Sequence, residues 1–143
     1  MIKKFLLLFV LNLFLVENTF SQENFFTKAK KLYENKKYEE SKFLFQRDIV
    51  FNPKKANSYL FLAKISKIEE NLQEEEKNLN TTLLLDPKNE EAIFLLINIE
   101  IERSNFIKAN KLKDNFKNVC SNFCSKMPSI DEKLKNFDTK NES

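Results

Sequence analysis

The segments Ile49-Val50-Phe51-Asn52-Pro53-Lys54 and Leu83-Leu84-Leu85-Asp86-Pro87-Lys88 carry the same pattern. Each is an apolar run, followed by Asn or Asp, then Pro and Lys. Proline lacks a backbone N–H and disfavours helical geometry in the residue before it. Each apolar run therefore predicts the last turn of a helix. Pro53 and Pro87 are 34 residues apart, and this period predicts a repeated structural unit.

The same period relates other positions. Four sets of large or small apolar residues fall in register: Phe25, Tyr59 and Ile93; Phe26, Leu60 and Phe94; Ala29, Ala63 and Ile97; and Tyr38, Leu72 and Phe106. Within the second period, Tyr59, Leu62 and Ala63 follow the i, i+3, i+4 spacing of an amphipathic helix. Apolar spacing restarts at Leu72, after a polar stretch. Each period thus predicts two amphipathic helices joined by a short turn.

These features resemble the tetratricopeptide repeat (TPR) family, whose units are 34-residue helix–turn–helix pairs. Residues 33–41 are similar to the family's turn and the opening of its second helix. Ser41 in the first unit and Ala109 in the third occupy the family's small-residue site in that helix. The resemblance covers roughly Gln22 to Val119. It implies an all-α, right-handed α-solenoid of about three units, at about 22–55, 56–89 and 90–123, within a repeat region of 22–126.

Several residues depart from the family pattern. Glu75 stands at the small-residue site of the second unit, which predicts looser helix packing there, and Ile97 replaces a small residue in the third. The turns between helices carry Lys36, Glu70 and Ser104, where Gly is usual. Apolar spacing in the third unit continues to 123, which predicts a longer helix. An unrelated helical bundle is the alternative to the TPR fold.

A further helix is expected over residues 127–137. Ser129 and Glu132 have the spacing of a capping box, and Ile130, Leu134 and Phe137 form an apolar stripe. Solenoids need such a cap because each repeat buries its apolar face only against a neighbour. Residues 138–143 are predicted to be a flexible tail.

The first 21 residues have the pattern of a bacterial secretory signal peptide. Two lysines follow Met1, Phe5 to Val16 is apolar except for Asn12, and small residues precede Gln22. An uncleaved anchor is the alternative, although this apolar run is short against the roughly 20 residues that span a bilayer. Export to the periplasm or the extracellular medium is therefore expected, with no stable membrane insertion after cleavage.

Composition argues against most catalytic and nucleic-acid-binding functions. The chain has 143 residues, no Gly, no His and a net charge of +3. Without Gly, most phosphate-cradling loops are excluded, and without His the commonest general base and metal ligand are missing. Interspersed Lys and Glu indicate a solvated surface rather than a basic nucleic-acid-binding face. We therefore expect no enzymatic activity, no metal and no cofactor.

Cys120 and Cys124 are the two cysteines of the chain. In an oxidising compartment such a pair is usually a disulfide. A bridge between positions i and i+4 is strained inside a regular helix, so it is easier if the helix ends near Ser121. Buried thiols and a redox role are the alternatives.

The resemblance to TPR proteins implies a partner-binding groove lined by the first helix of each unit. The groove positions in this sequence are Phe26, Lys30, Tyr33, Leu60, Lys64, Lys67, Phe94, Asn98 and Ile101. Phe26, Leu60 and Phe94 would form an apolar strip beside a polar row of Lys30, Lys64 and Asn98. Such a groove suits a segment with apolar anchors and acidic groups. Alternatively, the aromatic residues pack between helices and the lysines are merely solvated.

The sequence therefore predicts a non-catalytic protein-binding module of the cell envelope, which docks a peptide or helix of another protein. The alternative is a structural accessory subunit or a self-associating protein without a free groove. A homo-oligomer is possible in either case, because three repeats are about the minimum for a stable solenoid.

Overall fold

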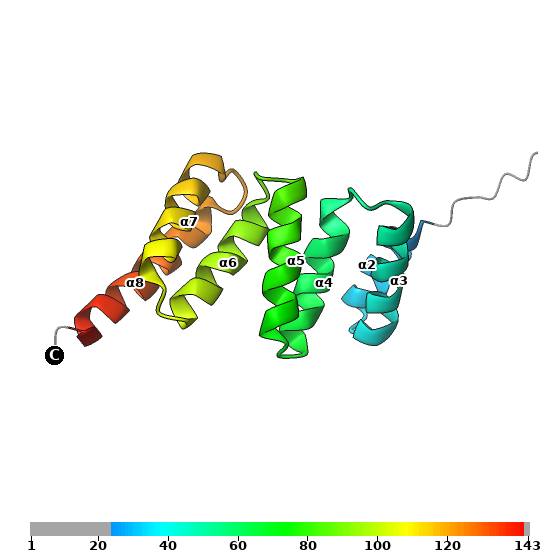
Figure 1. The fold of residues 1–143 in the computed structure, drawn as a ribbon, viewed down its shortest axis with the longest axis horizontal. Helices are drawn as coiled ribbons and strands as arrows, with labels where there is room; N and C mark the ends of the chain where they lie inside the picture. Colours follow the sequence, from blue (N-terminus) through cyan, green and yellow to red (C-terminus); the bar gives the residue numbers. More distant parts are fainter. Residues whose placement is uncertain (1–23, 142–143) are drawn as a thin grey trace, which may run out of the picture.

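The computed structural model describes residues 24–141, so the expected signal peptide lies outside the described residues. The described fold is all-α (Figure 1), as predicted. Three successive helix pairs are α2 (Phe25–Glu34) with α3 (Tyr38–Phe51), α4 (Ala56–Ile68) with α5 (Leu72–Leu85), and α6 (Glu90–Glu102) with α7 (Phe106–Val119). A 3-10 turn, η1 (Cys124–Lys126), then leads into α8 (Met127–Asn141).

The turn within each pair is closed by one residue in the left-handed conformation. Lys36, Glu70 and Ser104 have φ values of 60°, 57° and 59°. In the first turn the N–H of Lys37 donates to the carbonyl of Leu32, and the N–H of Lys36 to that of Tyr33, both at 2.9 Å. These two bonds form a Schellman motif, which satisfies carbonyls at the helix end. The same bonds recur in the other two turns.

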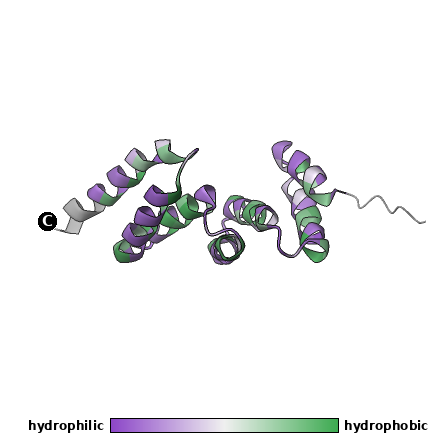
Figure 2. Cartoon of the chain, turned by 90° about the horizontal axis from the view of Figure 1, so that it is seen from above, coloured by the Kyte–Doolittle hydropathy of each residue, from purple (hydrophilic) through white to green (hydrophobic). Residues whose placement is uncertain are grey.

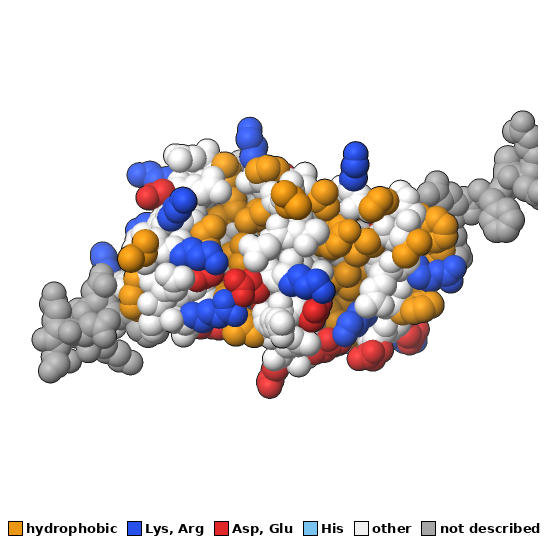
Figure 3. Space-filling view, in the orientation of Figure 1, with side chains coloured by type: hydrophobic (Ala, Val, Ile, Leu, Met, Phe, Trp, Pro, Cys, Tyr) orange, Lys and Arg blue, Asp and Glu red, His pale blue; other side chains and the backbone are white. Residues whose placement is uncertain are grey.

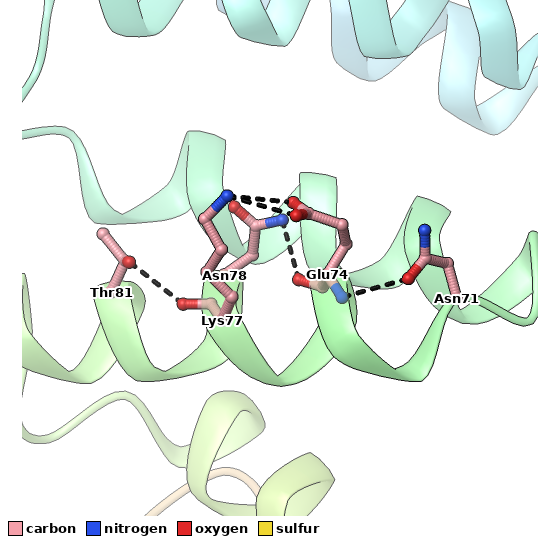
Figure 4. Close-up of polar contacts among 5 residues, drawn as sticks. All are labelled: Asn71, Glu74, Lys77, Asn78 and Thr81. Atoms are coloured by element: carbon pink, nitrogen blue, oxygen red, sulfur yellow. Dashed lines mark hydrogen bonds and ion pairs between the residues drawn. The ribbon is translucent and has the colours of Figure 1, made fainter.

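The residue after each left-handed position is the N-cap of the second helix of the pair. Asn71 Oδ1 accepts a hydrogen bond from the N–H of Glu74 at 3.1 Å, as Figure 4 shows. Asn105 caps α7 in the same way through the N–H of Lys108. Lys37, the corresponding residue of the first unit, makes no side-chain cap hydrogen bond. All three turns thus join a helix end to a helix start within a few residues, and two of them add a side-chain N-cap.

The apolar core lies between successive units. Leu62 and Ile65 of α4 are buried against Ala29 and Phe45 of the first unit. Their counterparts one period later, Leu96 and Ile99 of α6, are buried against Leu60 and Leu79 of the second. Figure 2 shows that the coloured helices carry both hydrophobic and hydrophilic residues. Each unit thus completes the core of the unit before it.

The two ends of the stack differ from this pattern. In α2, exposed Lys28 and Lys31 stand where α4 has Leu62 and Ile65, so the first unit presents a polar face outward. At the other end, Ile130 of α8 lies one period after Leu96 and is fully buried in the core of the third unit. Polar outer faces are what terminal repeats of a solenoid need. Helix α8 takes the place of the first helix of a further unit.

An ion pair at equivalent positions joins neighbouring units, and the unit that supplies the cation differs between the two junctions. Lys42 Nζ of α3 lies 2.6 Å from Glu69 Oε2, which follows α4. The positions one period later carry the reversed charges, and Arg103 Nη1 lies 2.5 Å from Glu76 Oε2. The two junctions therefore use the same geometry with exchanged charges.

Three expectations about the C-terminal part are corrected. Helix α7 ends at Val119 instead of continuing to 123, because Cys120 has extended backbone angles. Ser129 lies inside α8 and not at its N-cap, because the helix begins at Met127. The backbone of α8 continues to Asn141, past the expected end at 137, because residues 129–141 contain no Gly or Pro to stop it.

We expect replacement of Lys36, Glu70 or Ser104 by Gly to stabilise the protein. A residue with a Cβ is disfavoured at positive φ by about 1–2 kcal/mol, whereas the entropic cost of Gly is about 0.5–1 kcal/mol. Each change should raise the free energy of unfolding by about 0.5–1 kcal/mol, measured by urea denaturation. Gln46→Gly, at an exposed position inside α3, is the matched control and should destabilise, because Gly is unfavourable in a helix interior. Equal effects at positions 36 and 46 would contradict this explanation.

Candidate binding surface

The nine residues predicted to line a groove do not form one continuous row. Phe26, Tyr33 and Lys64 come together on the first two units, with Lys30 and Lys67 exposed near them in sequence. Leu60, Asn98 and Ile101 are buried, and Phe94 is half-buried against the core of the third unit. The expected apolar strip of Phe26, Leu60 and Phe94 is thus interrupted at its centre, where Leu60 belongs to the core between units two and three.

An aromatic cluster joins the first two units. Phe61 of α4 meets Phe26 and Tyr33 of α2 edge-to-face, with ring centroids 5.8 and 5.2 Å apart. Its other side stacks on the fully buried Phe45 of α3 at 4.9 Å. Phe26, Tyr33 and Phe61 are each half-buried, so their rings both pack and reach the surface. Such pairs contribute about 0.5–1.5 kcal/mol beyond area burial.

Phe61 was missed at the sequence level. Its counterparts at the repeat period are Thr27 and Leu95, so it belongs to no aromatic set that the repeat would reveal. Its i, i+3 partner on α4, Lys64, was predicted, and this spacing places the two side chains on one face of the helix.

Two lysines lie over these rings. Lys64 Nζ is 4.9 Å from the Phe61 centroid and 5.5 Å from that of Tyr33. Lys55 Nζ lies 4.1 Å from the centroid of Phe26. A cation within about 6 Å of a ring face is attracted by the ring quadrupole. We call Phe26, Tyr33, Phe61, Lys55 and Lys64 the aromatic–lysine surface.

Acidic groups of the same chain accompany both cations. Glu91 Oε1, from the first turn of α6, lies 2.8 Å from Lys64 Nζ. Asp48 Oδ2 lies 3.5 Å from Lys55 Nζ and is itself buried. Burial raises the pKa of the Tyr33 hydroxyl, an effect that Lys64 opposes. Tyr33 therefore stays protonated at neutral pH and can donate a hydrogen bond.

The other two predicted lysines pair with glutamates. Lys30 Nζ lies 3.8 Å from Glu34 one turn later, and both side chains are exposed. Lys67 Nζ lies 3.9 Å from Oε1 of Glu75. Glu75 is buried at the small-residue site of α5, and this burial raises the pKa of its carboxyl group. A long side chain is thus accommodated where the repeat pattern favours a small one.

In the third unit, α8 lies over the predicted groove positions. Lys133 Nζ of α8 donates to Asn98 Oδ1 at 2.5 Å, and the amide of Asn98 donates to the carbonyl of Phe94 at 2.8 Å. Ile101 is buried in the same cluster as Ile130 and Leu134. These groove positions contact the protein's own C-terminal helix, so we restrict the candidate surface to the first two units.

The loop between α7 and α8 is tied at two points. Cys120 and Cys124 are joined by a disulfide with a Cα–Cα distance of 5.2 Å. The carboxylate of Glu90, at the start of α6, accepts hydrogen bonds from the N–H of Phe123 at 2.7 Å, the N–H of Asn122 and the hydroxyl of Ser121. The Phe123 bond, followed by those of Ser121, lowers the pKa of Glu90 to about 2. The sequence indicated that a disulfide could form in this loop but did not predict the contacts with Glu90.

Solved structures with TPR-type architecture superpose on the chain. The type III secretion translocator chaperone SycD of Yersinia enterocolitica matches with a TM-score of 0.73 and 15% identity, covering 92% of this chain and 94% of that one. The TPR domain of Sgt2 from Aspergillus fumigatus matches with a TM-score of 0.63 and 13% identity, covering 87% and 81%. The fold is TPR-like. No protein-family model matches the chain, and no curated sequence does.

Within residues 24–141, none of the helices has both the length and the apolar character needed to cross a membrane. The same residues contain no group of three or more His, Cys, Asp or Glu side chains placed to hold a metal ion. The polar groups gathered on the first two units are instead cations over aromatic rings, an arrangement suited to non-covalent recognition.

We expect Glu90→Gln to remove a pH-dependent part of the stability. The folded pKa of about 2 lies below the ordinary value of 4.5. The ionised carboxylate therefore stabilises the fold fully above about pH 4.5, and this contribution is lost as the pH falls through about 2. Thermal unfolding between pH 2 and 7 should show the wild type and the variant differing near neutrality and converging in acid. Glu132→Gln, at an exposed position of α8, is the control. A constant difference across this range would contradict the assignment.

Proposed function

We propose that the protein is a non-catalytic binding module of the bacterial cell envelope, which docks a segment of another protein on its aromatic–lysine surface. The observation that carries this proposal is the position of Lys64 over two partly exposed rings that belong to different helices. The rings offer contact area to apolar anchors, and the ammonium group offers a partner to an acidic group.

The paired state of Lys64 indicates how such a segment would bind. Lys64 and Glu91 are 25% and 29% exposed, so their ion pair is reached by solvent. A carboxylate of an incoming segment can replace Glu91 as the partner of Lys64, while its apolar neighbours cover Phe61 and Phe26. Because one ion pair is exchanged for another, most of the net affinity would come from apolar contact, and charge would supply selectivity.

Structural neighbours support a protein-binding module. SycD has been solved in complex with a peptide of the translocator YopD, with a TM-score of 0.72 and 15% identity to this chain, covering 85% of it. A further neighbour is the CopN–Scc3 complex, with a TM-score of 0.63 and 15% identity. These proteins share the fold with this chain, and we propose that this chain also uses it to hold a partner protein.

The envelope location rests on the N-terminal sequence. Residues 1–21 have the charge and apolar pattern of a secretory signal, which would deliver the mature chain to the periplasm or the medium. The Cys120–Cys124 disulfide suits such a compartment, because cytosolic thiols are kept reduced.

The competing function is a structural accessory subunit whose apolar surface is permanently covered inside a larger assembly. The cover that α8 places over Asn98 favours this interpretation for the third unit, because α8 occupies the groove positions there. The open rings of the first two units favour the binding module.

We expect Lys30→Glu/Lys64→Glu to abolish capture of the dominant partner when the protein is crosslinked in its own cell envelope and partners are identified by mass spectrometry. Charge reversal would repel an acidic segment, which should weaken binding at least about tenfold. Binding to the wild type should also weaken as salt is raised, because exposed charges are screened.

Lys111→Glu/Lys117→Glu, an equally large charge change at two exposed positions of α7, is the matched control and should leave capture intact. Far-ultraviolet circular dichroism checks that each variant is folded. Retention of the same partner by Lys30→Glu/Lys64→Glu would place the interface elsewhere. Crosslinks to the same protein alone would favour the structural accessory.

A further inference from the structure

Helix α3 presents an outward face that is unusually apolar for a solvated surface. Phe43, Val50 and Phe51 are 57%, 76% and 55% exposed within the described part of the chain. Together with Arg47 they recur at intervals of three and four residues, so they lie along one side of the helix. Figure 3 shows hydrophobic side chains gathered with basic ones over the end of the molecule that α3 forms. Contiguous apolar patches of this kind mark interaction sites.

This face is separate from the aromatic–lysine surface. Phe45, which stacks on Phe61, points to the opposite side of α3 and is fully buried. The counterparts of Phe43 and Arg47 one period later are Lys77 and Thr81, so the second unit does not repeat the patch. The residues of this face are therefore not required by the repeat fold itself.

Arg47 is held in place at the middle of the face. Its guanidinium lies 4.8 Å from the ring centroid of Phe25 and 5.8 Å from that of Phe43, and Phe51 stacks on Phe25 at 5.5 Å. Ring contacts restrict the side chain before any partner arrives, which lowers the entropic cost of using it in an interface. Arg and aromatic residues are also the types enriched at interface centres.

The outer face of α3 is acidic at the start of the helix and basic further along, so the face of one copy is complementary to that of a second copy turned end for end. Glu39 and Glu40 are exposed in the first turn of α3, and Arg47 follows two turns later. Two α3 helices packed antiparallel about a two-fold axis beside Phe43 bring each Arg47 level with Glu39 and Glu40 of the second copy. A parallel arrangement would place like charges together. A closed two-fold interface needs this kind of self-complementarity.

The apolar residues fit the same arrangement. A shallow hollow beside the start of α3 is lined by Leu32, Phe43, Leu44 and the two glutamates. In the antiparallel pair, Val50 and Phe51 of one copy extend toward this hollow of the other. We propose that the protein forms a two-fold homodimer through the outer face of α3, with Arg47 paired to Glu39 and Glu40 across the interface.

Sedimentation of the protein, purified as the cell makes it, tests the proposal. The wild type should be a dimer at micromolar concentration, and Val50→Glu should raise the dimer dissociation constant at least about tenfold. Leu84→Glu is the matched control, because Leu84 is the counterpart of Val50 in the second unit and is 81% exposed. It should leave the dimer intact.

Two charge variants make the test specific for the antiparallel arrangement. Arg47→Glu alone and Glu39→Arg/Glu40→Arg alone should each be monomeric, because each creates like-charge contacts at both ends of the interface. An equimolar mixture of the two should form a heterodimer, since every contact then joins opposite charges. Partner capture through Lys64 should persist in the Val50→Glu monomer, which separates this proposal from the proposed function.

Three outcomes would overturn the dimer. A monomeric wild type would do so, as would a dimer unaffected by Val50→Glu, and so would a mixture of the two charge variants that stays monomeric. A wild type that becomes dimeric only after removal of residues 1–23 would show that this segment of the same chain occupies the face, and would also overturn the proposal.

Discussion

The structure depends on the packing of the first helix of each unit against the unit before it. Leu62 and Ile65 complete the core around Phe45, and Leu96 and Ile99 do the same around Leu79. Within residues 24–141 no helix pair buries its apolar face alone, so stability is shared along the stack. This explains why α2 carries polar residues at these positions and why α8 must supply Ile130 at the far end. The aromatic–lysine surface results from the same packing, because Phe61 lies on α4, the helix that completes the core of the first unit, and contacts α2 from there.

The repeat could be predicted from the sequence because its determinants are local and periodic. Pro53 and Pro87 follow the ends of α3 and α5, because proline disfavours a helix interior, and the three turn positions recur at the same period. The candidate site was only partly predictable because its members break the period. The counterparts of Phe61 in the first and third units are Thr27 and Leu95, so no aromatic pattern identified Phe61. Leu60 was expected on the surface, yet the third unit covers it, which depends on packing between units rather than on spacing within one.

The C-terminal part shows the same limit. Apolar spacing suggested that α7 continues to 123, but Glu90 binds the N–H groups of Asn122 and Phe123, which a continued helix would use internally. A carboxylate distant in sequence thus holds the backbone that follows the helix end. The buried Glu100, held by Lys108 at 2.6 Å and by Asn105, is a further contact that periodicity could not reveal, since its counterparts are Leu32 and Ser66.

The exchanged charges at the two junctions have a consequence for how the chain assembles. Repeats of similar sequence can stack in the wrong order, because a later unit offers an apolar face much like that of its neighbour. If α6 docked on the first unit and skipped the second, Arg103 would lie against Lys42, and Glu76 would lose its partner. The correct order joins opposite charges at both junctions, whereas the skipped order joins like charges. The alternation of charge therefore disfavours the skipped order, because that order brings two cations together and leaves two carboxylates unpaired.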